Sequence, residues 1–160
     1  MPRIGVTGHM NLSPDTVELV AAAIKELLAA YPPSELTGVS CIAAGADSIF
    51  AEAVVDAGGR LEVVLPAADY RERRVKPNHA PTFDRLIVHA AEVRVMPHLE
   101  SNRAAYEAAN EAMLHSCELL VAVWDGQPAV DRGGTAAVVD QAAARGLTIQ
   151  VVWPQGAQRA

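Results

Sequence analysis

The stretch ELLVAVWDGQPAVDRGGTAAVVDQAAA at positions 118–144 decides how the rest of the chain is interpreted. Its continuous apolar run at 119–124 is typical of a strand buried on both faces of a parallel sheet. The run ends at the turn pair Asp125-Gly126. Small residues after Gly133-Gly134-Thr135 favour a helix to about Arg145. We therefore predict a strand, a loop, a glycine-rich turn and a helix.

The glycine-rich turn has the chemistry of an anion site. In an open α/β sheet the ligand crevice lies outside the carboxyl ends of the strands. A helix that begins there offers unpaired N–H groups and a positive dipole end. Gly133 and Gly134 carry no Cβ to keep a phosphate away, and Thr135 adds a hydroxyl donor. The turn therefore predicts phosphate binding; a plain turn without a ligand is the alternative.

Composition predicts one domain over residues 1–160, with a core of Val, Ala, Leu and Ile, because hydrophobic residues make up 51% and aromatic ones 4%. The formal charge of −6 argues against a broad surface for nucleic acid or an anionic membrane. Neither Cys41 and Cys117 nor the five histidines show metal-ligand spacing, so we expect free thiols and no metal site. With no signal peptide and no membrane-length apolar run visible, we expect a cytoplasmic protein.

Strand and helix patterns alternate along the whole chain, which favours a single-domain, Rossmann-like three-layer α/β sandwich with a mostly parallel sheet. We expect a first helix to begin at Ser13-Pro14, and Asp47 or Ser48 to cap the second. The expected strands lie at 3–8, 38–43, 60–65, 92–96, 119–124 and 148–153.

Three glycine turns follow predicted strands, at Gly8, Gly45 and Gly133-Gly134, and the carboxyl ends of parallel strands share one edge of a sheet. Their convergence predicts a ligand site. None of them matches the dinucleotide fingerprint or the P-loop, which argues against a Walker-type ATPase or an ordinary dehydrogenase.

Side chains that could serve this site lie on one predicted helix. Tyr106 and Asn110 are four residues apart and share a helix face, where they could stack on and hydrogen-bond a nucleobase, or pack at the core margin and face solvent. Arg103 opens the same helix and could hold a phosphate or carboxylate, or pair with Glu100 or Glu107.

Polar residues beside the turns complete the candidate set. His9 adjoins the first turn, and Asp47 and Asp125 follow strands, where they could contact a ribose hydroxyl or act as a helix cap and a turn former. Gly126 completes the turn after Asp125 and is counted with the ligand-binding set. No catalytic residue is assigned; the candidates are Asp125, Asp47 and Glu107.

Three segments together resemble the SLOG superfamily: VTGH at 6–9, AAGAD at 43–47, and the run from Tyr106 through LLVAVWDG to GGTAAVV. That superfamily joins the DNA-processing Smf proteins to the "lonely guy" cytokinin-activating enzymes in a Rossmann-like fold. The resemblance implies a nucleotide-type ligand at the strand edge. It assigns the phosphate-binding turn to Gly133, Gly134 and Thr135, the first turn to Gly8 and His9, and the second to Gly45 and Asp47.

Two departures from the family pattern affect the expected activity. Lonely-guy hydrolases carry P-G-G-x-G-T-x-x-E, and alignment on Gly134-Thr135 puts Val138 at the catalytic glutamate, while Asp140 falls on another helix face. Valine cannot act as a general acid or base. Met10 stands where related sequences often have an arginine in the first turn.

The first expectation is therefore a module that binds a nucleotide or nucleotide sugar and could serve as its sensor. An N-glycosidic or phosphate-bond hydrolase is the second reading. Single-stranded nucleic-acid binding through Arg71, Arg73, Arg74 and Lys76 is the third, and the acidic balance argues against it. A chain this apolar could also form a homo-oligomer through a face that the sequence does not identify.

Overall fold

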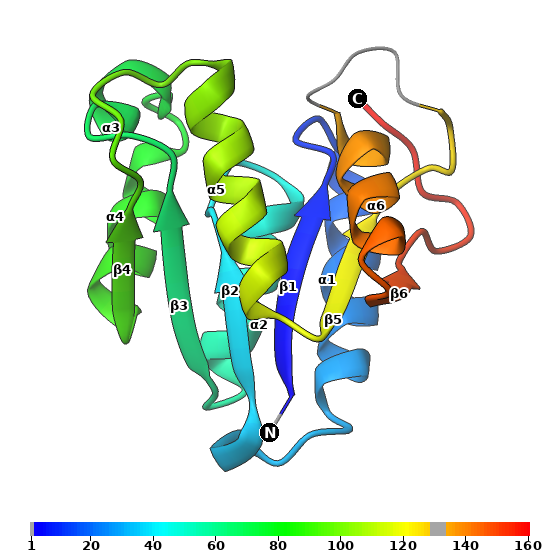
Figure 1. Ribbon diagram of the computed structural model, residues 1–160. Coiled ribbons are helices and arrows are strands. Elements are labelled where there is room, and N and C mark those ends of the chain that lie inside the picture. The colour runs from blue at the N-terminus through cyan, green and yellow to red at the C-terminus, as the bar shows by residue number, and fades with distance from the viewer. Residues whose placement is uncertain (1, 129–133) are drawn as a thin grey trace.

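The computed structural model describes residues 2–128 and 134–160. Its strands form one sheet in the order β4-β3-β2-β1-β5-β6, and every strand pair is parallel (Figure 1). The strands are β1 (Arg3–Gly8), β2 (Thr37–Ser40), β3 (Arg60–Leu65), β4 (Glu92–Val95), β5 (Leu119–Val123) and β6 (Thr148–Val151). The helices are α1 (Pro14–Leu28), α2 (Ala46–Asp56), α3 (Tyr70–Arg74), α4 (Ala80–His89), α5 (Arg103–Ser116) and α6 (Thr135–Ala144), with a 3₁₀ turn at Pro33–Glu35.

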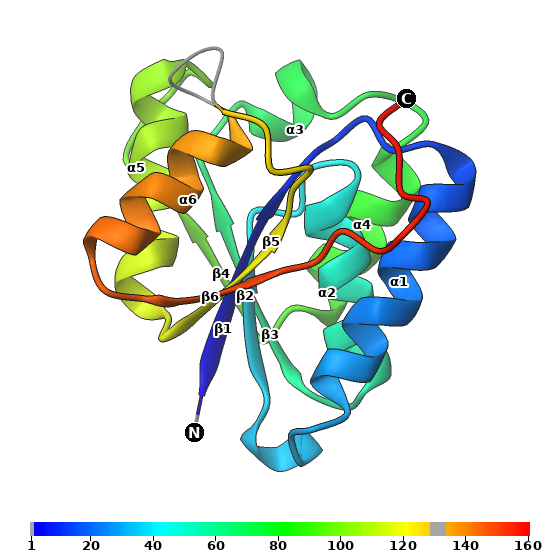
Figure 2. The same ribbon diagram turned by 90° about the vertical axis from the view of Figure 1, so that its right-hand side faces the viewer.

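Helices cover both faces of the sheet, so the chain is a three-layer α/β sandwich, as predicted. Helices α1, α2 and α4 lie on one face, and α5 and α6 lie on the other (Figure 2). The larger core packs Ile24 of α1 and Phe50 of α2 against the sheet, whereas the smaller core is built around Met113 of α5 and Val138 of α6. A strand covered on both sides must be apolar throughout, which explains the uninterrupted run in β5.

The first helix begins as predicted, and the second does not. The Ser13 hydroxyl oxygen accepts a hydrogen bond of 3.3 Å from the Thr16 N–H, which caps α1. The prediction that Asp47 or Ser48 caps α2 was wrong, because Gly45 is the N-cap and both residues lie in the first turn. The Ser48 hydroxyl instead donates to the Ala43 carbonyl at 2.7 Å. The reason is that the loop from β2 must fold tightly over residues 9–10 before the helix can start.

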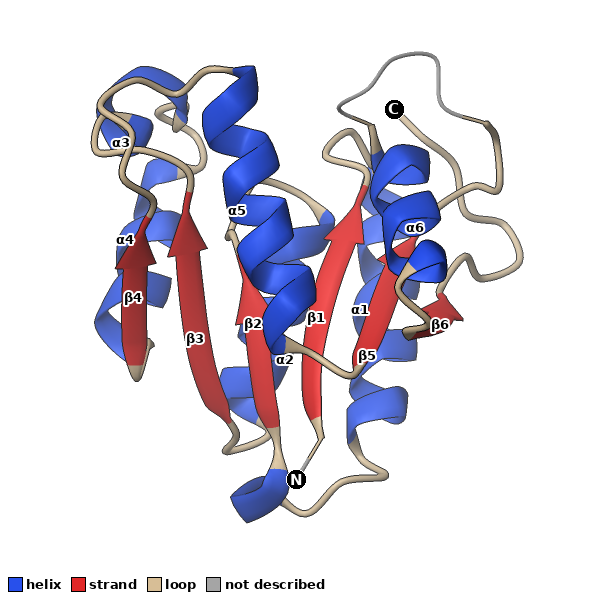
Figure 3. Ribbon diagram, viewed as in Figure 1, coloured by secondary structure: helices blue, strands red, loops and turns tan. Residues whose placement is uncertain are grey.

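The arrangement of strands and helices defines one functional edge. All strands point the same way, and α5 and α6 begin near the strand ends (Figure 3). Pairing of Gly8 with Val123 aligns the ends of β1 and β5, and Ser40 at the end of β2 pairs with Val63, two residues before the end of β3. Within the described residues, we find no helix with the length and apolar character that a bilayer crossing requires.

Candidate functional site

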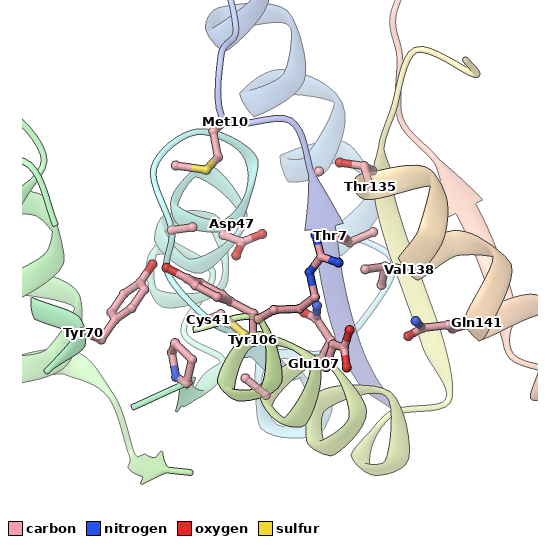
Figure 4. Close-up of a pocket in the computed structure, with 16 residues that line it drawn as sticks. Thr7, Met10, Cys41, Asp47, Tyr70, Tyr106, Glu107, Thr135, Val138 and Gln141 are labelled. Carbon is pink, nitrogen blue, oxygen red and sulfur yellow. The ribbon is translucent and has the colours of Figure 1, made fainter. Parts of the chain in front are cut away.

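A pocket of about 370 Å³ lies at the carboxyl edge of the sheet. Its walls come from the end of β1, the loop between β2 and α2, the segment after β3, and the facing surfaces of α5 and α6 (Figure 4). Seven of the residues predicted for the site line it: Gly8, Asp47, Arg103, Tyr106, Glu107, Asn110 and Thr135.

Helix α5 supplies four of these seven residues because of its spacing. Arg103, Tyr106, Glu107 and Asn110 lie three or four positions apart, so they occupy one side of the helix. The Asn102 side chain accepts a 2.9 Å hydrogen bond from the Ala105 N–H and sets where α5 begins. Tyr106 is 38% exposed although it is a large aromatic residue, so its ring is available to a ligand.

One side of the pocket gathers Asp47 with two tyrosine rings (Figure 4). The rings of Tyr70 and Tyr106 meet edge to face, with centroids 6.2 Å apart. Burial raises the pKa of Asp47 to about 7, while a hydrogen bond with the backbone of Ala43 opposes the rise. Burial also raises the pKa values of Cys41 and Tyr70. Near neutral pH this side of the pocket therefore holds Asp47 as a mixture of carboxyl and carboxylate, beside a neutral thiol and a neutral phenol.

Helix α6 forms the facing wall. Thr135 is its first residue, and Gly134 is its N-cap in an extended conformation. Val138 and Gln141 follow at intervals of three and line the same pocket (Figure 4). The position that the resemblance assigns to the catalytic glutamate is therefore an apolar part of the wall. Gly133 lies outside the described residues.

Gly8 and Gly45 are required by packing inside the protein. A Cβ on Gly8 would lie 2.5 Å from the Ala46 Cβ and 2.7 Å from the Val123 Cβ. A Cβ on Gly45 would lie 2.6 Å from the carbonyl oxygen of His9. These two glycines bring the first turn, α2 and β5 into contact, whatever else they do. Gly8 also borders the pocket, whereas Gly45 is not among its lining residues.

His9 and Asp125 form a second polar cluster beside the pocket. The Nε2 atom of buried His9 accepts a 3.1 Å hydrogen bond from the Asp125 N–H, and the rings of His9 and Trp153 lie nearly perpendicular with centroids 5.6 Å apart. Burial, with the positive charge of Arg159, lowers the pKa of His9, which favours the neutral ring. The Asp125 carboxylate accepts a 3.0 Å hydrogen bond from the Gln127 N–H, and this contact is the main reason that its pKa is lowered.

The His9–Asp125 cluster joins the end of β5 to the first turn. Neither residue lines the pocket, and Gly126 has nothing within 4 Å of the position a Cβ would take. A ligand role for His9, Asp125 and Gly126 stays a prediction.

Several residues that line the pocket were not predicted from the sequence as ligand contacts. Cys41 and Tyr70 follow the ends of β2 and β3, so the rule that located Gly8 and Asp47 also points to them. Gln141 would have been found from its spacing to Thr135 once α6 was known to face the edge. The lining residues not singled out as ligand contacts are Thr7, Met10, Cys41, Ala43, Pro66, Tyr70, Ala109, Val138 and Gln141.

Part of the basic segment after β3 is engaged by the protein itself. Arg71 donates two hydrogen bonds, of 2.7 and 2.6 Å, to Asp84, and Arg74 donates one of 2.7 Å to the Ser101 carbonyl. Two of the four cations proposed for nucleic acid therefore have partners already. Among residues 2–128 and 134–160, no three His, Cys, Asp or Glu side chains are grouped to hold a metal ion.

No protein-family model and no curated protein matches the chain. Several solved structures, however, match the chain. DNA processing protein A from Streptococcus pneumoniae matches with a TM-score of 0.72 at 18% identity, over 98% of this chain and 52% of that protein. The Moco carrier protein of Chlamydomonas reinhardtii matches with a TM-score of 0.58 at 19% identity, over 97% and 78%. The structural genomics target TM1055 matches with a TM-score of 0.59 at 16% identity, over 93% and 72%.

These three structures are SLOG-superfamily proteins. The chain shares the fold of these three structures. The resemblance drawn from the three sequence segments is thereby confirmed at the level of the fold. The chain spans about half the length of the DNA processing protein.

Proposed function

We propose that this SLOG-fold chain binds a nucleotide or a nucleotide-derived small molecule in the pocket between α5 and α6. The observation that carries the proposal is the convergence of seven predicted residues from β1, α2, α5 and α6 on one cavity of about 370 Å³. Small-molecule sites usually fall in this range of volume and combine apolar walls with a few placed polar groups. A protein named as a cofactor carrier shares the fold, which is consistent with a small ligand.

Each wall of the pocket suits a different part of such a ligand. The start of α6 offers backbone N–H groups and the Thr135 hydroxyl to a phosphate, and Arg103 can add a bidentate contact. The Tyr106 ring can stack on a base, and the Asn110 amide can hydrogen-bond its edge. Asp47 can accept a hydrogen bond from a ribose hydroxyl or a base N–H when it is ionised.

A thermal-shift screen with nucleotides, nucleotide sugars and inorganic phosphate tests the proposal. A ligand present at about a hundred times its dissociation constant should stabilise the fold by roughly 2.7 kcal/mol. Arg103→Met should weaken the binding of a hit at least about tenfold, because one charge-assisted contact contributes about 1.5–3 kcal/mol. Lys25→Met on α1 is the matched control, since it removes an exposed cation far from the pocket. A flat screen, or equal effects of both substitutions, would contradict the proposed site.

The second candidate function, hydrolysis of a nucleotide, rests on two carboxyl groups in the same pocket. Asp47 and Glu107 both line it, and a carboxyl with a pKa of about 7 can both donate and accept a proton at neutral pH. If the chain is a hydrolase, free base or phosphate should appear from a nucleotide panel, and Asp47→Asn or Glu107→Gln should lower the rate about a hundredfold or more.

Asp140→Asn on α6 is the control for the hydrolase test, because Asp140 is exposed and lies outside the pocket lining. A ligand that binds and is recovered intact would remove the hydrolase reading and leave a binding or sensing module.

A further inference from the structure

The outer strand β4 carries an exposed apolar surface. Strand β4 is at the end of the sheet, and all four of its residues are exposed (Figure 1). Val93 is 40% exposed and Val95 is 49% exposed, although valine is usually buried in a parallel sheet. Val88 of α4 and Leu99 after the strand are 80% and 84% exposed. In the part of the chain that the structure describes, four of the nine exposed large hydrophobic residues therefore lie between positions 88 and 99.

The backbone of β4 has one free edge. The Met96 N–H donates to the Leu65 carbonyl of β3 at 2.9 Å, in step with the pairing of Leu65 with Val95. Successive N–H groups of a strand point to opposite sides, so those of Val93 and Val95 point away from the sheet. An edge strand with unpaired N–H and C=O groups is a template for another strand.

We propose that β4 pairs antiparallel with β4 of a second copy of this chain, about a two-fold axis at Val93. In this register Glu92 lies opposite Arg94 of the second copy, and Arg94 lies opposite its Glu92. The backbone groups of Val93 point outward, so the two copies of Val93 exchange two hydrogen bonds across the axis. Val93 meets its own counterpart at the axis, and the two sheets become one continuous sheet.

Charge complementarity selects a second copy as the occupant. Charged side chains on an edge strand normally oppose pairing. Here the register partners Glu62 and Val64 place Glu92 and Arg94 on the same face of the sheet, two residues apart and opposite in sign. A two-fold axis between them turns that pattern into two attractive cross-strand pairs, which is the self-complementarity that a two-fold dimer requires. The opposite edge strand, β6, has no charged residue that could fix a register in the same way.

Charge reversal tests the register through the oligomeric state. By sedimentation equilibrium, the full chain should be a dimer. Arg94→Glu sets two carboxylates opposite each other at both ends of the strand pair, and Glu92→Arg sets two guanidinium groups opposite each other. Each should weaken dimerisation at least tenfold, and the double exchange E92R/R94E should restore it.

Lys25→Glu on α1 changes the net charge as Arg94→Glu does and should leave the dimer intact. A monomeric wild-type chain, or a dimer that neither single reversal weakens, would overturn the proposal. The assay needs no ligand, so its result is independent of the proposed nucleotide site.

A disulfide trap tests the position of the axis. Directly opposed residues that exchange two hydrogen bonds have Cα atoms about 5.5 Å apart, within the range that a disulfide spans. Val93→Cys should therefore form a cross-linked dimer under mild oxidation. Val95→Cys is the matched control, because in this register the two copies of residue 95 are about 13 Å apart. Failure of Val93→Cys to cross-link, or equal cross-linking of both variants, would contradict the register.

Discussion

Gly45→Ala is expected to lower the free energy of unfolding by about 3–5 kcal/mol, which combines overpacking with backbone strain. Gly45 has φ 81° and ψ −130°, a conformation that residues with a side chain rarely adopt. The added Cβ would also lie 2.6 Å from the His9 carbonyl oxygen and 2.7 Å from the Met10 Cα. Both neighbours are backbone atoms, so the contact cannot be relieved by a side-chain rotation.

Gly126→Ala separates the two causes. Gly126 has φ 83°, but nothing lies within 4 Å of its Cβ position. The free energy of unfolding of Gly126→Ala should therefore fall only by the cost of a left-handed backbone conformation, about 1–2 kcal/mol. Chemical denaturation of both variants without ligand measures the difference. Equal losses would show that the first turn can move away from α2, and that Gly45 does not hold the two together.

The fold was predictable because its signals are local and repeated. Strands buried on both faces are apolar throughout, and β1 and β3 have the boundaries that their apolar runs predict. The strand ends were less accurate elsewhere. The run at 38–43 continues beyond β2, which ends at Ser40, because the chain leaves the sheet to let Gly45 approach the first turn. Such a close approach between distant segments has no signal in sequence spacing.

The candidate site was predictable to the level of the sheet edge. The rule that ligands bind at the carboxyl ends of parallel strands located Gly8, Asp47 and Asp125 equally well. It does not tell which strand ends border the cavity. Asp125 follows β5 directly, yet its side chain serves its own turn through the Gln127 N–H. Tyr70 lines the cavity from the short helix α3, which its polar sequence did not predict.

Asp47→Asn is expected to stabilise the ligand-free chain at pH 8 by about 2 kcal/mol. Folding raises the pKa of Asp47 from its ordinary value of 3.8 to about 7. The folded state therefore binds the proton more tightly than the unfolded state, and the free energy of unfolding falls as pH rises from about 4 to about 7. Full burial would make this loss about 4 kcal/mol. Because Asp47 lines a pocket that a ligand can enter, we expect about half of it.

Denaturation of the wild type and Asp47→Asn at pH 4 and pH 8 measures this effect. The two proteins should have similar stability at pH 4 and should differ at pH 8. Asp125→Asn provides a control of opposite sign, since the pKa of Asp125 is lowered by its hydrogen bond from the Gln127 N–H, and its carboxylate stabilises the fold above its ordinary pKa. An Asp47→Asn variant that is less stable than the wild type at pH 8 would contradict the prediction.

The same variant also separates a structural role of Asp47 from a ligand-binding role. The Asp47 carboxylate destabilises the ligand-free fold, and a ligand that donates hydrogen bonds to it would explain its presence. In the bound state these hydrogen bonds would offset the free energy that burial of the carboxylate costs. Asp47→Asn should therefore have a higher Tm without ligand and a smaller thermal shift with it. A higher Tm with an unchanged shift would mean that the ligand does not contact Asp47, and would confine binding to the walls formed by α5 and α6.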